Sequence, residues 1–270
     1  MKHEIIKLKE YFPINTEAFI EVIIPFNDDN LIRKKSPGII IIPGGAYSFL
    51  SVRESDPVAF NFSLQGYITF VLHYSIKTSY PTPMLELAYA FSYLKDNAEK
   101  YYLDKNKLGI IGFSAGGHLV SSYGYLYSHE DFSKHHNLDT KKIRPSFIIS
   151  SYPVITMKDE THFETRENIT KLDDRLMKLL SVEDHITPDY PPTFVWTTRD
   201  DTCVKPINSL LFVEALKKNN IRHEFFYYQA LDHGLSIISP LLYDESTLKI
   251  KEYIEVSTWF DKAINFINKI

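Results

Sequence analysis

The sequence is poor in the groups that form disulfides, metal sites and polyanion-binding surfaces. Its 270 residues include a single cysteine, Cys203, so an intrachain disulfide is impossible and a cysteine-rich metal site is excluded. No block of lysine and arginine stands out, and the formal net charge of −4 argues against nucleic acid or an anionic membrane as a partner. No apolar run reaches the roughly 18 residues of a membrane-spanning helix, and the first residues show no signal-peptide pattern. We therefore expect a soluble, cytoplasmic protein.

Motifs for cofactor binding are also missing. The sequence has no HExxH metal motif, no P-loop and no dinucleotide-type GxGxxG, so we expect neither a metal nor a cofactor. The chain is 44% hydrophobic, which is enough for a substantial core. Its length fits one large α/β domain, and we predict a single domain over residues 1–270. The oligomeric state stays open, with a homodimer among the alternatives.

Short apolar runs alternate along the chain with stretches of helical periodicity. The run Ile39–Ile42, bounded by Pro-Gly on each side, is typical of a central strand buried on both faces. The alternation predicts a mostly parallel sheet with helices on both faces, in three α/β/α layers, and an antiparallel edge strand over 18–24. The other predicted strands are 67–74, 108–112, 147–151, 193–197 and 224–228, and the predicted helices are 55–64, 84–97, 115–127, 206–218 and 247–267.

The polar segment 156–192 interrupts this alternation. It holds a helical stretch at 170–180 and ends in a proline-rich run. We expect an insertion over the carboxyl edge of the sheet, either a small lid or a plain surface excursion.

The segment 112–116, Gly-Phe-Ser-Ala-Gly, fits the G-x-S-x-G pattern of a nucleophile elbow. An apolar strand leads into it and a predicted helix follows, so Ser114 would stand on a sharp strand-to-helix turn. Glycines two positions to either side remove side chains that would collide there. The N-terminus of the following helix favours negative charge developing at the site. We predict that Ser114 is a nucleophile.

A second glycine-rich turn, Pro43-Gly44-Gly45-Ala46-Tyr47, follows the first buried strand. In enzymes with a nucleophile elbow, a loop at this place supplies one amide of the oxyanion hole and the residue after the nucleophile supplies the other. The predicted donors are therefore Ala115 and either Gly45 or Ala46.

A triad in the chain order serine, acid, histidine needs a histidine near the C-terminus. His233 follows the last predicted strand, where active sites of open parallel sheets lie, whereas His223 precedes that strand. The acid should follow strand 193–197, where Asp200 and Asp201 are adjacent and only one can face the histidine. We predict that His233 is the base. Chain order alone does not decide whether Asp200 or Asp201 is the acid.

Four further polar residues have less defined roles. His118 could flank the site or pack within its helix, and His73 could contact the substrate at the site edge. Glu86 and Asp56 are expected to be solvated helix charges.

Together these segments resemble bacterial α/β-hydrolases, above all the acetyl xylan esterase-like group of carbohydrate esterases, which is related to the prolyl oligopeptidase and hormone-sensitive-lipase branches. The similarity covers roughly residues 37–235 and rests on segments 41–47, 53–59, 71–75, 80–83, 112–118 and 207–210. Many relatives carry His-Gly-Gly-Gly where this chain has Pro43-Gly44-Gly45-Ala46, a departure that bears on the oxyanion donors. Related enzymes place the acid three residues before a valine, so Val204 selects Asp201.

The resemblance implies a serine-dependent ester hydrolase that cleaves short acyl groups, acetyl above all, from small molecules such as acetylated sugars or oligosaccharides, through a Ser114–His233–Asp201 triad and an acyl-enzyme. One alternative is a serine exopeptidase with the same fold and triad. Another is a catalytically silent binding protein on that fold, against which all three triad residue types argue.

Overall fold

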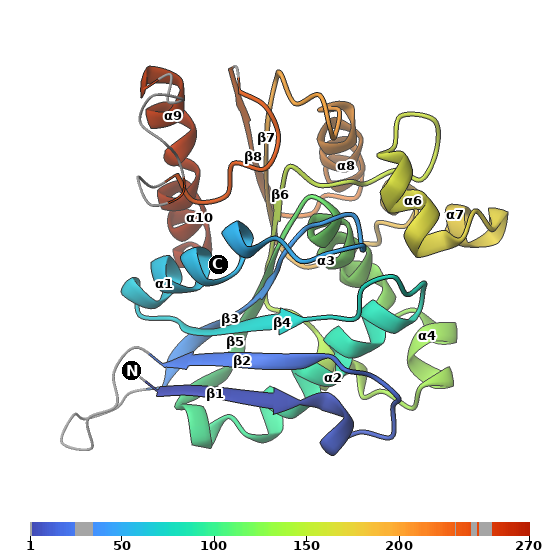
Figure 1. Ribbon diagram of the computed structural model, residues 1–270, viewed down its shortest axis with the longest axis vertical. Coiled ribbons are helices and arrows are strands. Elements are labelled where there is room, and N and C mark those ends of the chain that lie inside the picture. The colour runs from blue at the N-terminus through green and yellow to red at the C-terminus, as the bar shows by residue number, and fades with distance from the viewer. Residues whose placement is uncertain (1, 25–34, 230, 239–241, 243–249) are drawn as a thin grey trace.

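The computed structural model describes residues 2–24, 35–229, 231–238, 242 and 250–270. These residues form an eight-stranded sheet in the order β1-β2-β4-β3-β5-β6-β7-β8 (Figure 1). β1 and β2 pair antiparallel, β2 pairs antiparallel with β4, and every other neighbouring pair is parallel. The strands are β1 Lys2–Lys7, β2 Phe19–Ile24, β3 Ser36–Ile42, β4 Ile68–His73, β5 Leu103–Phe113, β6 Ile148–Ser151, β7 Thr193–Thr198 and β8 His223–Tyr228.

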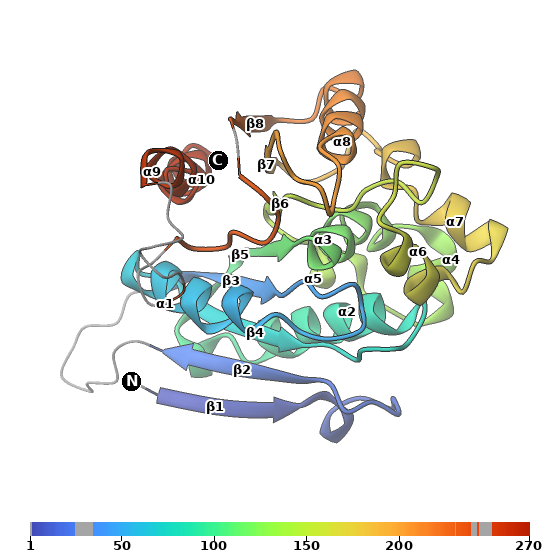
Figure 2. The ribbon, with the colours of Figure 1, turned by 45° about the horizontal axis from the view of Figure 1, so that its top comes forward.

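Helices cover both faces of this sheet, as the alternating pattern predicts, and Figure 2 shows α9 and α10 on one side with α3 and α8 on the other. The α-helices are α1 Asp56–Leu64, α2 Thr82–Asp96, α3 Ala115–Leu126, α4 Glu130–His135, α5 Thr140–Ile143, α6 Phe163–Thr170, α7 Asp174–Leu179, α8 Ile207–Lys218, α9 Ile250–Ser257 and α10 Trp259–Asn268. Among the described residues, no helix is both long and apolar enough to cross a bilayer.

The isoleucine run of β3 explains why both faces carry helices. Side chains of a strand alternate between the two faces of a sheet, and all four isoleucines at 39–42 are fully buried. Ile40 and Ile42 pack in the core under α2, α3 and α8, while Ile39 and Ile41 pack in the core under α1 and α10. A strand buried on both sides reads as an unbroken apolar run.

The structure corrects the prediction of an edge strand at 18–24. β2 is antiparallel, as expected, but β1 lies outside it and forms the sheet edge. β1 gives a weak sequence signal because one of its faces is open: Ile6 is 2% exposed whereas its neighbour Ile5 is 55% exposed. Lysines at both ends, Lys2 and Lys7, are typical of an edge strand protected from pairing with other chains.

The predicted helix 247–267 is two helices, of which residues 247–249 lie outside the described residues. Thr258 separates them, because its backbone N–H and its hydroxyl both donate to the Glu255 carbonyl, at 3.2 and 2.6 Å. These hydrogen bonds run to the residue three positions earlier instead of four, which interrupts the α-helical hydrogen-bond pattern. In segment 156–192, α7 lies within the predicted helical stretch 170–180, whereas α6, which ends at Thr170, was not predicted.

The expectation that Glu86 is a solvated charge is wrong. Glu86 is 1% exposed, and its carboxylate accepts hydrogen bonds from the Ser75 amide at 2.8 Å, the Ser75 hydroxyl at 2.6 Å and the Thr16 hydroxyl. Asp56 is half-buried rather than fully solvated. Burial raises the pKa of both carboxyl groups, and for Glu86 the hydrogen bonds from Ser75 and Thr16 oppose that effect.

Glu86 therefore makes stability depend on pH in a defined direction. Its folded pKa is above the ordinary 4.5, so the folded state binds this proton more tightly than the unfolded chain. The resulting stabilisation is present below the unfolded pKa and is lost as the pH rises through the folded pKa. We expect Glu86→Gln, which cannot ionise, to gain stability relative to the parent as the pH rises from about 4.5 to about 7.

Urea unfolding of the parent and Glu86→Gln at several pH values measures this difference directly. Glu214→Gln, which changes an exposed carboxylate on α8, is the matched control. A difference between the parent and Glu86→Gln that stays constant across the pH range would contradict the assignment.

Candidate active site

Ser114 stands between β5 and α3 with a backbone that few non-glycine residues adopt, φ 54° and ψ −118°. The two flanking glycines are needed for this turn. A Cβ on Gly112 would lie 2.1 Å from the Gly116 carbonyl oxygen, and one on Gly116 would lie 2.3 Å from the Ile42 carbonyl oxygen. The serine amide donates to the Ser151 carbonyl at 3.0 Å, which ties the turn to β6. The geometry is that of a strained elbow presenting a hydroxyl above the sheet.

Three side chains from separate loops meet at the carboxyl edge of the sheet. His233, which follows β8, has its Nε2 atom 2.8 Å from Ser114 Oγ and its Nδ1 atom 2.6 Å from Asp201 Oδ2. The other oxygen of Asp201 accepts from the amides of Cys203 and Val204, at 3.0 and 2.8 Å. These two amides fix the carboxylate so that Oδ2 faces the imidazole. Ser114, His233 and Asp201 thus form a continuous hydrogen-bonded series.

Asp200, the alternative acid, and His223, the alternative base, lie away from Ser114. The Asp200 carboxylate is 48% exposed and pairs with Arg199, whose Nε atom is 2.7 Å from Oδ1. His223 begins β8, and its Nδ1 atom lies 2.7 Å from the Ile221 carbonyl oxygen. The opposite directions of two adjacent side chains separate Asp201, which faces the histidine, from Asp200, which faces solvent.

The turn after β3 has consecutive positive φ values at Gly45 (125°), Ala46 (54°) and Tyr47 (60°). Two of its carbonyl groups are bonded within the turn: Gly44 O accepts from the Ser51 amide, and Gly45 O accepts from the Ser48 and Phe49 amides. Within the described residues, no acceptor is found for the backbone N–H groups of Gly45, Ala46 and Ala115. All three predicted oxyanion donors therefore keep their N–H groups available.

His118 was expected either to flank the site or to pack within its helix, and the structure shows the second arrangement. It is fully buried; its Nε2 atom donates to the Leu180 carbonyl at 3.0 Å, so Nδ1 accepts from the Tyr47 hydroxyl at 2.8 Å. Burial lowers the pKa of His118 to about 4, which keeps the ring neutral and able to accept that bond. His118 thereby holds Tyr47 in the strained turn.

A cavity of about 240 Å³ opens beside Ser114. Segment 156–192 supplies part of its wall, because His162 and Glu164 line it. Helix α6 is bonded to the turn after β3: Ser48 Oγ donates to Glu164 at 2.6 Å, and Asn168 Nδ2 donates to the Ala46 carbonyl at 2.9 Å. The lining residues are Gly45, Ala46, Phe49, Ser51, Arg53, Glu54, Ser114, His162, Glu164, Cys203, His233 and Gly234.

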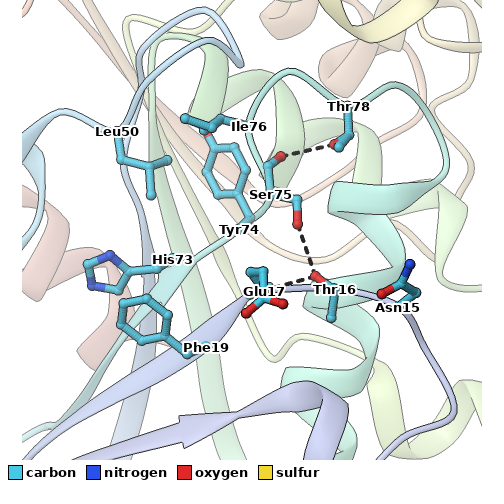
Figure 3. Close-up of a pocket in the computed structure, with 11 residues that line it drawn as sticks. Asn15, Thr16, Glu17, Phe19, Leu50, His73, Tyr74, Ser75, Ile76 and Thr78 are labelled. Carbon is cyan, nitrogen blue, oxygen red and sulfur yellow. Dashed lines mark hydrogen bonds between the residues drawn. The ribbon is translucent and has the colours of Figure 1, made fainter.

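His73 does not line that cavity. It lies in a separate pocket of about 410 Å³ beside the ends of β2 and β4 (Figure 3), where its ring stacks on Phe19 with centroids 4.2 Å apart. Its Nε2 atom is 3.0 Å from a Glu21 carboxylate oxygen. The alternative that His73 contacts a substrate at Ser114 therefore gains no support from its position.

Three residues that organise this site were not predicted from the sequence. Asp232 accepts from the Thr202 amide and hydroxyl and from the His233 amide, at 2.9 to 3.1 Å, and so joins the loops that carry the acid and the histidine. Glu54 and Tyr152 are buried and hydrogen-bonded to each other at 2.8 Å. Of these three residues, only Asp232 could have been found from the sequence, because it directly precedes the predicted base His233.

Among the described residues, no group of three or more His, Cys, Asp or Glu side chains is arranged to hold a metal ion. Cys203, which lines the cavity, has a pKa raised by burial and by the neighbouring carboxylate of Asp201, so its thiolate form is disfavoured.

The model of the BD-FAE family matches residues 28–216 of the chain. The chain belongs to the BD-FAE family. Its eight-stranded, mostly parallel sheet with helices on both faces is an α/β-hydrolase fold. A crystal structure of an acetyl ester-xyloside bifunctional hydrolase from Caldicellulosiruptor lactoaceticus matches with a TM-score of 0.79 and 30% identity over 97% of each chain.

Two curated relatives of this BD-FAE protein are much longer than it. Endo-1,4-beta-xylanase B of Butyrivibrio fibrisolvens is 34% identical over 220 residues, which cover 78% of this chain and 34% of the relative. Acetylxylan esterase of Xylanibacter ruminicola is 28% identical over 223 residues, which cover 78% of this chain and 43% of the relative. The chain spans less than half the length of these relatives.

Proposed function

We propose that this protein is a carboxylic ester hydrolase in which Ser114 is the nucleophile, His233 the general base and Asp201 the residue that orients the base. The observation that carries the proposal is the hydrogen-bonded series from Asp201 through His233 to Ser114, at 2.6 and 2.8 Å. Serine is a weak nucleophile at neutral pH and needs an adjacent base to react. The oriented imidazole supplies that base.

Acylation begins when His233 Nε2 removes the Ser114 proton as Oγ attacks the ester carbonyl carbon. The tetrahedral oxyanion accepts hydrogen bonds from the Ala115 amide and from the amide of Gly45 or Ala46. Asp201, bonded to Nδ1, stabilises the imidazolium without taking its proton. The carbon–oxygen bond to the alcohol then breaks, the imidazolium gives its proton to the leaving alkoxide, and the acyl group stays on Ser114.

Deacylation repeats these steps with water. His233 removes a proton from a water molecule that attacks the acyl carbonyl, and the same amides hold the second oxyanion. The bond to Oγ breaks, and the proton returns from His233 to Ser114. A carboxylic acid leaves, and the catalytic groups are restored.

We further propose that the acyl group is short, with acetylated sugars as the class of substrate. The cavity of about 240 Å³ beside Ser114 is small beside the roughly 300–1,000 Å³ of typical ligand pockets. Names of relatives point the same way, since they include an acetylxylan esterase and an acetyl ester-xyloside bifunctional hydrolase. The insertion 156–192 then serves as a wall that limits the space beside the nucleophile, through His162 and Glu164.

A chain-length series of p-nitrophenyl esters tests the proposal. We expect kcat/KM for the acetate to exceed that for the octanoate by at least about tenfold, because each methylene that finds no room weakens binding of the transition state. Activity must be absent from Ser114→Ala in the same preparation. A preference for the octanoate would contradict the short-acyl proposal, and faster hydrolysis of aminoacyl-p-nitroanilides than of esters would contradict the esterase proposal.

A further inference from the structure

We propose that Glu54 is a positioning residue that holds two catalytic loops at a fixed distance from each other. The first is the oxyanion loop, residues 44–51, and the second is the histidine loop, residues 231–238. The inference rests on the proposed function, because both loops belong to the same site.

Glu54 fixes the oxyanion loop through Gly44. The Gly44 amide donates to Glu54 Oε2 at 2.8 Å, and the Gly44 carbonyl accepts from the Ser51 amide at 3.0 Å. The two peptide planes that flank Gly44 are thereby both held, and the second of them carries the Gly45 N–H. The direction of that N–H depends on these bonds, since peptide groups are planar.

The other carboxylate oxygen of Glu54 reaches the histidine loop through Tyr152. The Tyr152 hydroxyl donates to Glu54 Oε1 at 2.8 Å and accepts from the Ser236 amide at 2.9 Å. Ser236 is held from two more directions: its hydroxyl donates to the Arg53 carbonyl at 2.6 Å, and its carbonyl accepts from Trp259 Nε1 at 2.9 Å. The Tyr152 ring also packs edge-on against the His233 ring, with centroids 5.0 Å apart. His233 thus rests on a loop whose backbone is bonded to Glu54 through one tyrosine.

The burial of Glu54 indicates that its carboxylate has a role that an apolar side chain could not fill. Glu54 is 3% exposed, and burial raises its pKa, while the Tyr152 hydroxyl and the Gly44 amide act in the opposite direction. A buried carboxylate costs free energy that an apolar side chain of the same size would not. What the carboxylate offers instead is two acceptor oxygens on one rigid group, one for each loop.

Glu54→Gln removes this property while keeping the size of the side chain. A glutamine has one acceptor oxygen and one donor nitrogen, so it can accept from Gly44 or from Tyr152 but not from both. With its oxygen on Gly44, its NH₂ faces the Tyr152 hydroxyl, which already accepts from the Ser236 amide, and the Tyr152 proton loses its charged acceptor. Tyr152→Phe breaks the same connection from the other side and keeps the aromatic ring against His233. Either change should misplace catalytic groups by a fraction of an ångström, which costs rate rather than substrate affinity.

The experiment compares kcat, KM and Tm of the full-length protein on p-nitrophenyl acetate. We expect Glu54→Gln to lower kcat about 10- to 100-fold and Tyr152→Phe about tenfold, each with KM changed less than about threefold. The double variant should lose little more than Glu54→Gln alone, because both changes break one connection. Glu86→Gln is the matched control: it changes another buried, hydrogen-bonded carboxylate, away from the cavity beside Ser114, and should keep the parent kcat.

Three outcomes would overturn the inference: kcat within about twofold of the parent in Glu54→Gln and Tyr152→Phe, losses that simply multiply in the double variant, or an equal loss in Glu86→Gln at the same Tm. If Glu54→Gln does not fold, Tyr152→Phe alone decides by the same limits. A parent protein that neither hydrolyses the ester nor reacts with a fluorophosphonate at Ser114 would instead contradict the proposed function.

Discussion

Replacing Ser114 by alanine is expected to lower kcat/KM for p-nitrophenyl acetate by about 10⁵- to 10⁶-fold, while leaving Tm close to that of the parent. In the proposed mechanism the Ser114 oxygen forms the acyl-enzyme, and another nucleophile that lines the cavity, the Cys203 thiol, has a pKa raised by burial. Residual activity would come from the oxyanion amides and from binding alone, which remain in the variant. The change also removes no packing partner from the core.

Steady-state rates should be paired with labelling by a fluorophosphonate, which reacts only with an activated serine. Labelling should disappear in Ser114→Ala and persist in Ser128→Ala, which changes an exposed serine just beyond α3. Ester hydrolysis above about one-tenth of the parent rate in Ser114→Ala would show that another group carries the reaction.

The second large effect is expected from Asp201→Asn, with a fall in kcat of about 10⁴-fold. The oxygen of the asparagine amide must face the Cys203 and Val204 N–H groups, which donate to Oδ1 in the parent. Its NH₂ group then faces His233 Nδ1, where the parent has a carboxylate oxygen at 2.6 Å. Two donors cannot share this position, so the imidazole carries its proton on Nε2 and cannot accept the Ser114 proton.

Asp200→Asn is the matched control, because it makes the same chemical change one residue earlier. The Asp200 carboxylate is 48% exposed and pairs with Arg199, and exposed ion pairs contribute little. We expect its kcat to stay within about threefold of the parent. The assignment of Asp201 would be wrong if Asp200→Asn lost the larger share of kcat at equal Tm.

The features that were predictable from sequence are those that local backbone geometry dictates. The strand Ile39–Ile42 is an unbroken apolar run because both faces of β3 are covered. Gly112 and Gly116 flank Ser114 because a Cβ at either place would overlap a carbonyl group. In such segments a few neighbouring residues contain the whole constraint, so the pattern predicts the structure.

The features that escaped prediction depend on partners far away along the chain. Glu86 was expected in solvent because its helix gives no sign of Ser75 and Thr16, which satisfy its carboxylate. Glu54 likewise depends on Tyr152, 98 residues later. Edge strand β1 was missed for a different reason. One of its faces is open to solvent, so only every second residue needs to be apolar and the strand contains no continuous apolar run.

In the proposed ester hydrolase, the bond from Asn168 to the Ala46 carbonyl would couple the wall of the cavity to the turn after β3. An acyl group too bulky for the cavity would press on His162 and Glu164 at the start of α6. A displacement of α6 would release the Ala46 carbonyl from Asn168. The peptide group of this carbonyl directly follows the Ala46 N–H, so one of the proposed oxyanion donors would lose a neighbouring support just when an oversized molecule occupies the site. Poor substrates should therefore bind well enough to act as competitive inhibitors of good ones, yet turn over slowly, because crowding of the wall is transmitted to the groups that stabilise the transition state.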